Sequence, residues 1–200
     1  MAPSATISHP PTSPPPPSAL SETLLQSTKS PHPPHLHNLA LQIQHDLLHQ
    51  HDWTLLQIHT HSPLTTLPLP RPLISGLPPK RAYIHPDEQV EILKAEHKSA
   101  SGERSIAQKP EREWVLPTQL MEKMSLRKLA ELFDAVGTVP PGGGEEDDGE
   151  EGGGEGEMKK VGWQWQGENR QKRILLATLH DDSTVVYYIM HDGIVKPRQN

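Results

Sequence analysis

The sequence contains no cysteine, few aromatic residues and no long apolar run. Without cysteine, disulfide frameworks, thiolate zinc sites and cysteine nucleophiles are excluded, and a reducing intracellular compartment is expected. Aromatic residues make up 4% and hydrophobic residues 33% of the 200 positions, which is a low share for a compact domain. No apolar run approaches the ~20 residues of a membrane span. Residues 1–30 also lack the order of charged and apolar regions that a secretory signal requires.

Charge is distributed unevenly along the chain. The formal net charge is −6, but eight acidic side chains lie between Glu145 and Glu157 with no basic residue among them. The rest of the chain then carries 17 acidic and 19 basic residues. We interpret residues 138–160 as an acidic, glycine-rich insert. A solvated linker is the simpler explanation, and a decoy that competes with nucleic acid for a basic groove is the alternative.

Proline marks the other low-complexity segment. Ten of the 22 prolines precede residue 35, so residues 1–34 cannot bury enough apolar surface to offset the entropy of ordering. We predict a disordered arm that serves as a spacer or as a ligand for proline-binding modules. Residues 35–200 are then left for one folded domain, in which the polar segment 98–112 is expected to be a flexible loop.

The first half of this domain gives mixed secondary-structure signals. Apolar residues at helical spacing predict a helix from Leu36 to about His51, followed by an extended stretch over 53–61. In that stretch, alternation places Trp53 with Leu55, opposite Leu56 and Ile58. Five prolines within 66–79 predict an edge strand or an extended loop and argue against a central strand. A short strand is expected at 83–85, and residues 89–94 fit either a strand or a helical turn.

The second half is clearer. Residues 114–116 read as extended structure before Pro117. Ser125 is then a typical N-cap for a helix that continues to Val136 and stops at Gly137. Residues 174–179 and Thr184–Met190 are strong strand signals joined by only four residues, which predicts an antiparallel hairpin. The last strand is apolar on both faces, so it is either enclosed in the core or covered by a partner.

Three patterns could carry chemistry. Eight histidines lie within residues 32–61, and His45 and His49, one helical turn apart, could hold a metal or simply form a solvated helix face. The Asp87, Glu96 and Lys98 side chains resemble a Mg²⁺-dependent nuclease pattern, provided that they lie on adjoining strand ends. A patch of basic and aromatic residues could bind RNA, or could be an edge strand with its tryptophans in the core. It comprises Lys159, Lys160, Trp163, Trp165, Arg170, Lys172 and Arg173.

The C-terminal hairpin carries a family resemblance. The run from Leu175 to Tyr188, followed by Asp192-Gly193 and Pro197, resembles the end of the smallest structural subunit of the eukaryotic tRNA-splicing endonuclease, the Sen-fifteen type. Residues 115–118 with the helix after Ser125 resemble the central segment of that family. Residues 76–88 look like its fungal version. The resemblance covers residues 36–200 apart from 98–112 and the acidic insert.

This resemblance implies an α/β fold like the C-terminal domain of the catalytic endonuclease subunits, with a mixed or antiparallel sheet and flanking helices. It also implies a structural subunit that pairs its last strand with that of another subunit and helps to position pre-tRNA for cleavage at the intron ends. The catalytic relatives use Tyr, His and Lys. Lys172 lies near the position of that lysine, but no matching Tyr or His motif is present upstream. We therefore expect no catalytic residue, no cofactor and no metal.

The resemblance and the residue pattern together predict two binding sites. The partner strand is expected at Thr184, Val185, Val186, Tyr187, Tyr188, Ile189 and Met190. Asp181 and Asp182 correspond to an acidic docking loop between dimers, although an ordinary solvated turn is equally consistent with them. We expect catalytic and structural endonuclease subunits as partners, indirect contact with pre-tRNA, no small-molecule substrate and no membrane span. The expected location is the nucleus, or alternatively the cytoplasmic face of the mitochondrial outer membrane.

Two other functions compete with this prediction. The first is an autonomous Mg²⁺ nuclease that uses Asp87, Glu96 and Lys98. The second is an adaptor whose function resides in the proline-rich arm.

Overall fold

The computed structural model describes residues 18, 31–98, 108–142 and 161–193. Most of the predicted disordered arm, flexible loop and acidic insert lie outside these ranges. The described residues form an α/β fold with a five-stranded mixed sheet and flanking helices, as predicted. The helices are α2 (Pro34–His49), α3 (Pro86–Lys98) and α4 (Leu126–Asp134). The strands are β1 (Thr54–His61), β2 (Pro68–Leu77), β3 (Glu113–Gln119), β4 (Arg173–Leu179) and β5 (Val185–His191).

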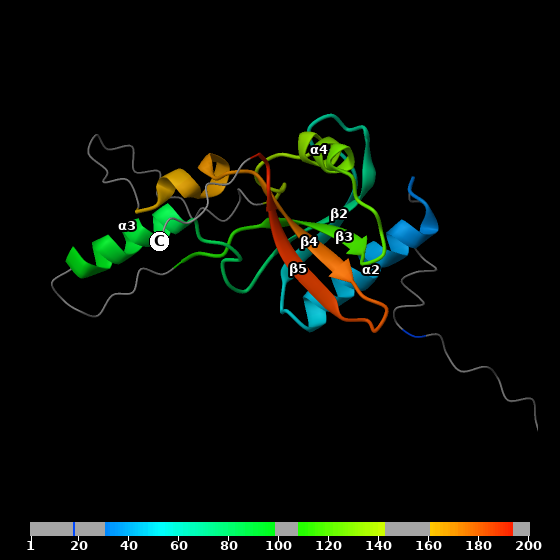
Figure 1. The fold of residues 1–200 in the computed structure, drawn as a ribbon, viewed down its shortest axis with the longest axis horizontal. Coiled ribbons are helices and arrows are strands. Elements are labelled where there is room, and N and C mark those ends of the chain that lie inside the picture. Colours follow the sequence, from blue (N-terminus) through cyan, green and yellow to red (C-terminus); the bar gives the residue numbers. More distant parts are fainter. Residues whose placement is uncertain (1–17, 19–30, 99–107, 143–160, 194–200) are drawn as a thin grey trace, which may run out of the picture.

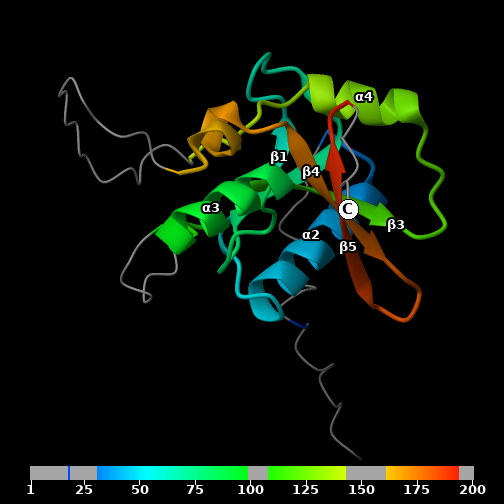
Figure 2. The ribbon, with the colours of Figure 1, turned by 60° about the vertical axis from the view of Figure 1, so that its left-hand side comes forward.

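The strands follow one another across the sheet in chain order, from β1 to β5. Neighbouring strands are antiparallel except for β3 and β4, which are parallel and are connected through α4. Helices α2 and α4 lie on opposite faces of this sheet (Figures 1 and 2). The α2 face and the α4 face are named accordingly below. β1 and β5 are the two edge strands.

Helix α2 covers one face because its apolar residues recur every three or four positions. Pro34 begins the helix, where a missing N–H costs nothing, and Ala40, Ile43 and Leu47 are buried. Ile43 and Leu47 belong to a cluster with Trp53, Ile74, Val115 and Ala177. The predicted helix is confirmed, with its end at His49.

Strand β1 contains a bulge that the alternation pattern did not predict. Leu55 has a φ of 51°, and the pairing register with β2 shifts between Thr54 and Gln57. The extra residue turns the chain, so Trp53 packs in the same cluster as Leu56 and Ile58. The prediction that Trp53 lies opposite Leu56 was therefore wrong.

Strand β2 lies inside the sheet, between β1 and β3, so the prediction of an edge strand or loop was also wrong. The position of its prolines explains why this is tolerated. Its ladder with β3 involves only Ile74, Ser75 and Gly76, which lie beyond the last proline of the strand. Pro68 pairs with His61 next to a second register shift in β1. The prolines are thus confined to the half of the strand where β3 requires no N–H donor.

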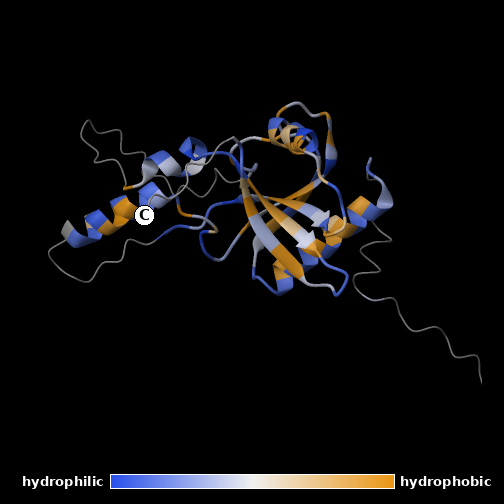
Figure 3. Ribbon diagram, in the orientation of Figure 1, coloured by the Kyte–Doolittle hydropathy of each residue, from blue (hydrophilic) through white to orange (hydrophobic). Residues whose placement is uncertain are grey.

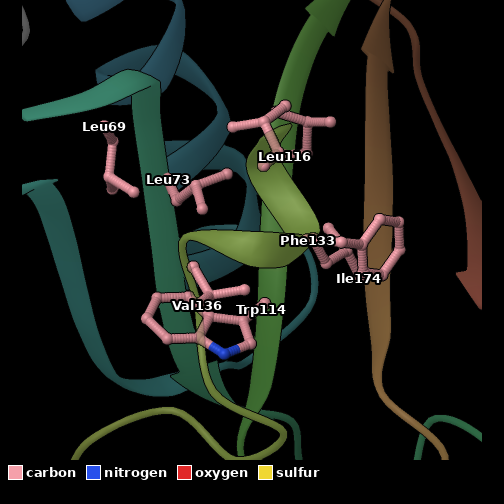
Figure 4. Close-up of a cluster of buried hydrophobic side chains, with 8 residues drawn as sticks. Leu69, Leu73, Trp114, Leu116, Phe133, Val136 and Ile174 are labelled. Carbon is pink, nitrogen blue, oxygen red and sulfur yellow. The ribbon is translucent and has the colours of Figure 1, made fainter. Parts of the chain in front are cut away.

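Helix α4 covers the second face. Ser125 caps it by accepting a hydrogen bond from the Lys128 backbone N–H at 3.3 Å, as predicted. Leu132, Phe133 and Val136 pack against Trp114 and against the other side chains of this cluster: Leu69, Leu73, Leu116 and Ile174 (Figure 4). The Trp114 indole N–H donates to the Gly137 carbonyl at 3.0 Å, which fixes the chain just after the helix.

Three further expectations are corrected, and one open choice is settled. Residues 83–85 form no strand, and residues 89–94 lie within α3, which settles the choice in favour of a helix. Strand β3 does not stop before Pro117 but continues to Gln119. Residues 163–165 form a short 3₁₀ helix and not the edge strand of the alternative interpretation.

Helix α3 projects from the sheet on the side of the 3₁₀ segments (Figures 1 and 2). Charged side chains hold its base. Glu88 is fully buried and accepts hydrogen bonds from Arg81 at 2.6 Å and from Gln166 at 2.8 Å. Arg81 also lies 3.7 Å from Glu111, which binds Arg170 and Arg173. This charged network, completed by Glu113, connects α3, β3, β4 and the 3₁₀ segments.

Candidate protein-binding site at the free strand edge

Strands β4 and β5 form the predicted antiparallel hairpin. Seven consecutive residue pairs join them, from Arg173 with His191 to Leu179 with Val185, without a register shift. The turn is held by the His180 N–H, which donates to the Thr184 carbonyl at 2.8 Å. Ser183 takes a φ of 67° in this turn. The ladder begins at Val185, so Thr184 of the predicted binding stretch belongs to the turn, and His191 extends the strand by one residue.

The two edges of the sheet differ in how they are protected. Strand β1 is interrupted by two register shifts, and such irregularity discourages a further strand from pairing. Strand β5 has a regular ladder and contains no proline, lysine or glycine. Within the described ranges, no strand pairs with its outer edge. β5 is therefore the less protected of the two edges.

The α2 face of β5 is closed by the chain itself. The Tyr187 hydroxyl donates to the Asp46 carboxylate at 2.6 Å, and its ring meets the His51 ring edge-on at 5.0 Å. Burial and the Asp46 carboxylate both raise the pKa of Tyr187, so this hydroxyl stays protonated as a donor. Further along, His191 packs against Tyr83 with ring centroids 4.8 Å apart. Sequence reasoning did not find Asp46, because no local pattern relates α2 to β5.

The α4 face of β5 is open. Val186 is 41% exposed and Tyr188 is 59% exposed, whereas Met190 packs against the cluster below α4. The hydropathy colouring shows the apolar character of this strand (Figure 3). The prediction of a strand with two apolar faces is thus confirmed, but one face is already occupied.

The hairpin turn presents the two predicted docking acids. Asp182 accepts hydrogen bonds from the Thr184 backbone N–H at 2.9 Å and pairs with His180 at 3.0 Å. The backbone hydrogen bond from Thr184 is the largest cause of the lowered pKa of the Asp182 carboxyl, which keeps it ionised. Asp181 is exposed beside it. The turn therefore offers negative charge to solvent, and docking through it stays a prediction.

The structure does not bring the nuclease-like residues together on strand ends. Asp87, Glu96 and Lys98 all lie in α3, where the two acids are nine positions apart, about 13 Å along the helix axis. Two carboxylates that far apart cannot share one Mg²⁺ ion, whose ligands lie at about 2.1 Å. Nothing in this arrangement favours the nuclease hypothesis.

Most described side chains of the basic and aromatic patch make contacts within the fold. Arg170 and Arg173 are buried and bind Glu111 and Glu113. The Lys172 ammonium donates to the Phe133 carbonyl at 3.0 Å, near the end of α4. Trp165 stacks on His85, with ring centroids 5.5 Å apart. Lys159 and Lys160 lie outside the described residues. The cationic groups that could bind phosphates are therefore mostly committed to structural contacts.

The histidines do not form a metal site in the part of the chain that the structure describes. The rings of His45 and His49 lie 4.3 Å apart, but no third ligand converges on them or on any other pair there. No helix in the same ranges is both long and apolar enough to cross a membrane.

The fold strongly lowers the pKa of His59. Its ring packs against Trp114, and its Nε2 lies 2.8 Å from the Ser75 hydroxyl, which also accepts from Arg112. Burial, assisted by the Arg112 charge, lowers the pKa of His59 to about 4. An unfolded histidine titrates near 6.5, so the unfolded chain binds the proton more tightly.

We therefore expect His59 to destabilise the fold as the pH falls from about 6.5 to about 4. Above the unfolded pKa, the contribution of the neutral His59 ring to the free energy of unfolding is fully present. As the pH falls through this window, the unfolded chain takes up the proton first, and the free energy of unfolding falls by about 1–2 kcal/mol for this partly exposed ring. Urea unfolding at several pH values measures this, with His59→Gln as the comparison. Equal pH slopes in the two chains would contradict the prediction.

The described residues define an α/β domain with a regular, unpaired edge strand, and comparison with known proteins shows its family. The family model of the Sen15 protein matches residues 42–145 and 156–200. A probable tRNA-splicing endonuclease subunit, tsp-1 of Neurospora crassa, is 49% identical over 167 residues, which covers 83% of this chain and 67% of that protein. The chain therefore belongs to the Sen15 family, and the resemblance found in its C-terminal hairpin is confirmed.

Proposed function

We propose that this protein is a structural subunit of a tRNA-splicing endonuclease, which supports recognition and cleavage of pre-tRNA at the intron ends. The observation that carries this proposal is the regular, unpaired edge of β5 in a chain of the Sen15 family. A strand from another subunit would extend the sheet there by backbone hydrogen bonds. The binding residues are those of the predicted stretch Thr184–Met190.

The proposed role is non-catalytic. Lys172, which lies near the position of the lysine in the catalytic relatives, donates to a backbone carbonyl of α4 and so stabilises the end of that helix. Among its described contacts there is neither a tyrosine nor a histidine that could exchange a proton with RNA. Attack of a 2′-hydroxyl on a phosphate requires both a base and an acid, which one lysine does not supply.

Reconstitution with pre-tRNA tests this role. The chain alone should not cleave the RNA, with or without Mg²⁺, and it should restore cleavage when added to the remaining subunits. Lys172→Arg retains a donor for the Phe133 carbonyl but cannot act as a general acid near neutral pH, because the pKa of arginine exceeds 12. We expect the Lys172→Arg complex to cleave at the wild-type rate. A loss of about a hundredfold or more would indicate a catalytic lysine.

Two parts of the proposal concern the surroundings of the subunit. Asp181 and Asp182 are proposed to dock into a basic cleft of a neighbouring pair of subunits, which their exposed position permits. The location stays a prediction, with the nucleus first and the cytoplasmic face of the mitochondrial outer membrane as the alternative. No observation favours the adaptor function, since the proline-rich arm lies almost wholly outside the described residues.

A further inference from the structure

The loop that joins β3 to α4 carries exposed apolar side chains. In this loop Leu120 is 51% exposed and Met121 is 76% exposed, and Leu126, the first residue of α4, is 85% exposed. Single exposed apolar residues are common on protein surfaces, but three large ones within seven positions, close to an unpaired strand edge, indicate a contact surface. Neither the β3 ladder nor the packing of α4 explains why these three positions are apolar.

This loop lies on the side of the sheet that leads to β5. The Leu120 N–H donates to the Leu179 carbonyl at 2.9 Å, and Leu179 pairs with Val185 at the beginning of β5. Since neighbouring strands are about 4.8 Å apart, the backbone of Leu120 lies about 10 Å from the start of β5. Val186 and Tyr188, the exposed side chains of β5, alternate onto the α4 face.

We use the name apolar band for five exposed apolar residues in the loop, at the start of α4 and on the α4 face of β5: Leu120, Met121, Leu126, Val186 and Tyr188. The packing below α4 leaves the band exposed. The α4 side chains pack with Leu73, Trp114 and Ile174 (Figure 4), and the β5 residue that joins this cluster is Met190, which lies beyond Val186 and Tyr188. The other face of β5 is closed by α2 through the Asp46 contact with Tyr187. The most exposed side chains that β5 offers to a pairing chain therefore lie on the α4 face.

We propose that the subunit whose strand pairs with β5 also covers the apolar band, by placing an apolar helix or loop against the loop between β3 and α4. This inference rests on the proposed function and names its second contact surface. Backbone pairing along an edge is insensitive to sequence, so the apolar band would supply the side-chain contacts that select the correct subunit.

A protein partner fits the band better than RNA. None of the five side chains carries a charge for phosphates, and Tyr188 alone among them offers a ring for base stacking. Two arginines near this loop are paired with acids, Arg127 with Glu131 at 3.1 Å and Arg71 with Glu122 at 2.7 Å. Lys123 and Lys128 are also exposed near this loop, so the experiment must separate RNA binding from protein binding.

The test uses Met121→Asp together with Leu126→Asp in the full chain. Both side chains are mostly exposed, so the variant should fold as the wild type does, which circular dichroism and urea unfolding check. We expect its affinity for the purified remaining subunits, measured by titration, to fall at least tenfold. The matched control is Leu64→Asp with Leu67→Asp, which are 59% and 64% exposed in the loop between β1 and β2 and should change the affinity less than twofold.

The outcomes separate this inference from the proposed function. If the wild-type chain does not bind the remaining subunits, the proposed function is wrong and the inference falls with it. If the wild type and the loop variant bind equally well, the inference alone is overturned. It is also overturned if the variant loses only affinity for pre-tRNA, or only self-association, or if the control variant is weakened as strongly.

Discussion

A chain with Val186→Asp and Tyr188→Asp is expected to bind the remaining endonuclease subunits at least a hundredfold more weakly than the wild type. Both side chains point from β5 onto the open α4 face, where a paired subunit would exclude water. Burying an unpaired carboxylate costs several kcal/mol, and a hundredfold loss of affinity corresponds to about 2.7 kcal/mol. The free chain should remain folded, because these positions are 41% and 59% exposed in it.

Co-purification and titration with the remaining subunits measure this loss. The opposite edge supplies a control: Leu55→Asp on β1 replaces a side chain of similar exposure, 56%, at a positive φ that aspartate tolerates well. We expect the Leu55→Asp chain to associate normally. Association of the double variant at wild-type strength would refute pairing through β5.

The elements predicted correctly are those whose signal is local. The capped helix α4 is evident from Ser125 and the spacing of the apolar residues after it, and the hairpin from two apolar runs separated by four residues. Helix α2 is predicted for the same reason. In each case, residues that lie close in the chain also make the stabilising contacts.

The elements predicted incorrectly depend on distant parts of the chain. Prolines are incompatible with a central strand only where both neighbouring strands need N–H donors. How far β3 pairs along β2 depends on β3 and cannot be predicted from the β2 residues alone. The bulge at Leu55 is held by Arg112, which donates to the Leu55 carbonyl at 3.0 Å from 57 residues away. Similarly, residues 161–165 are held by Glu88 through Gln166, so their alternating pattern was misleading.

The candidate site was predictable in its position but not in its shape. The stretch Thr184–Met190 reads as a strand with two apolar faces, which explains why a partner was expected. That the α2 face is already closed depends on the contact between Asp46 and Tyr187, which are 141 residues apart. The contribution of Leu120, Met121 and Leu126 was also missed, because three apolar residues near a helix start are ordinary in a sequence and become notable only when they stay exposed.

Replacing Glu113 by alanine is expected to lower the free energy of unfolding by about 3–5 kcal/mol, the largest effect on stability that we predict. Glu113 is almost fully buried and accepts hydrogen bonds from Arg173 at 3.1 Å and from Arg170 at 3.2 Å. Burial by itself would lower the pKa of Arg173, but the hydrogen bonds and the charge of Glu113 raise it above its usual value. Both guanidinium groups therefore depend on this carboxylate.

Without Glu113, two buried cations would share only Glu111, which also lies 3.7 Å from Arg81 at the base of α3. The loss of stability should therefore extend from the sheet to the ion pairs that hold the base of α3. We expect the backbone amides of α3 to exchange with deuterium faster than those of α2. Urea unfolding measures the stability, and Arg127→Ala is the control. It breaks a pair whose side chains are 89% and 48% exposed and should cost at most about 0.5 kcal/mol. Similar costs for the two variants would mean that water reaches the charged network and weakens its ion pairs as it does those at the surface.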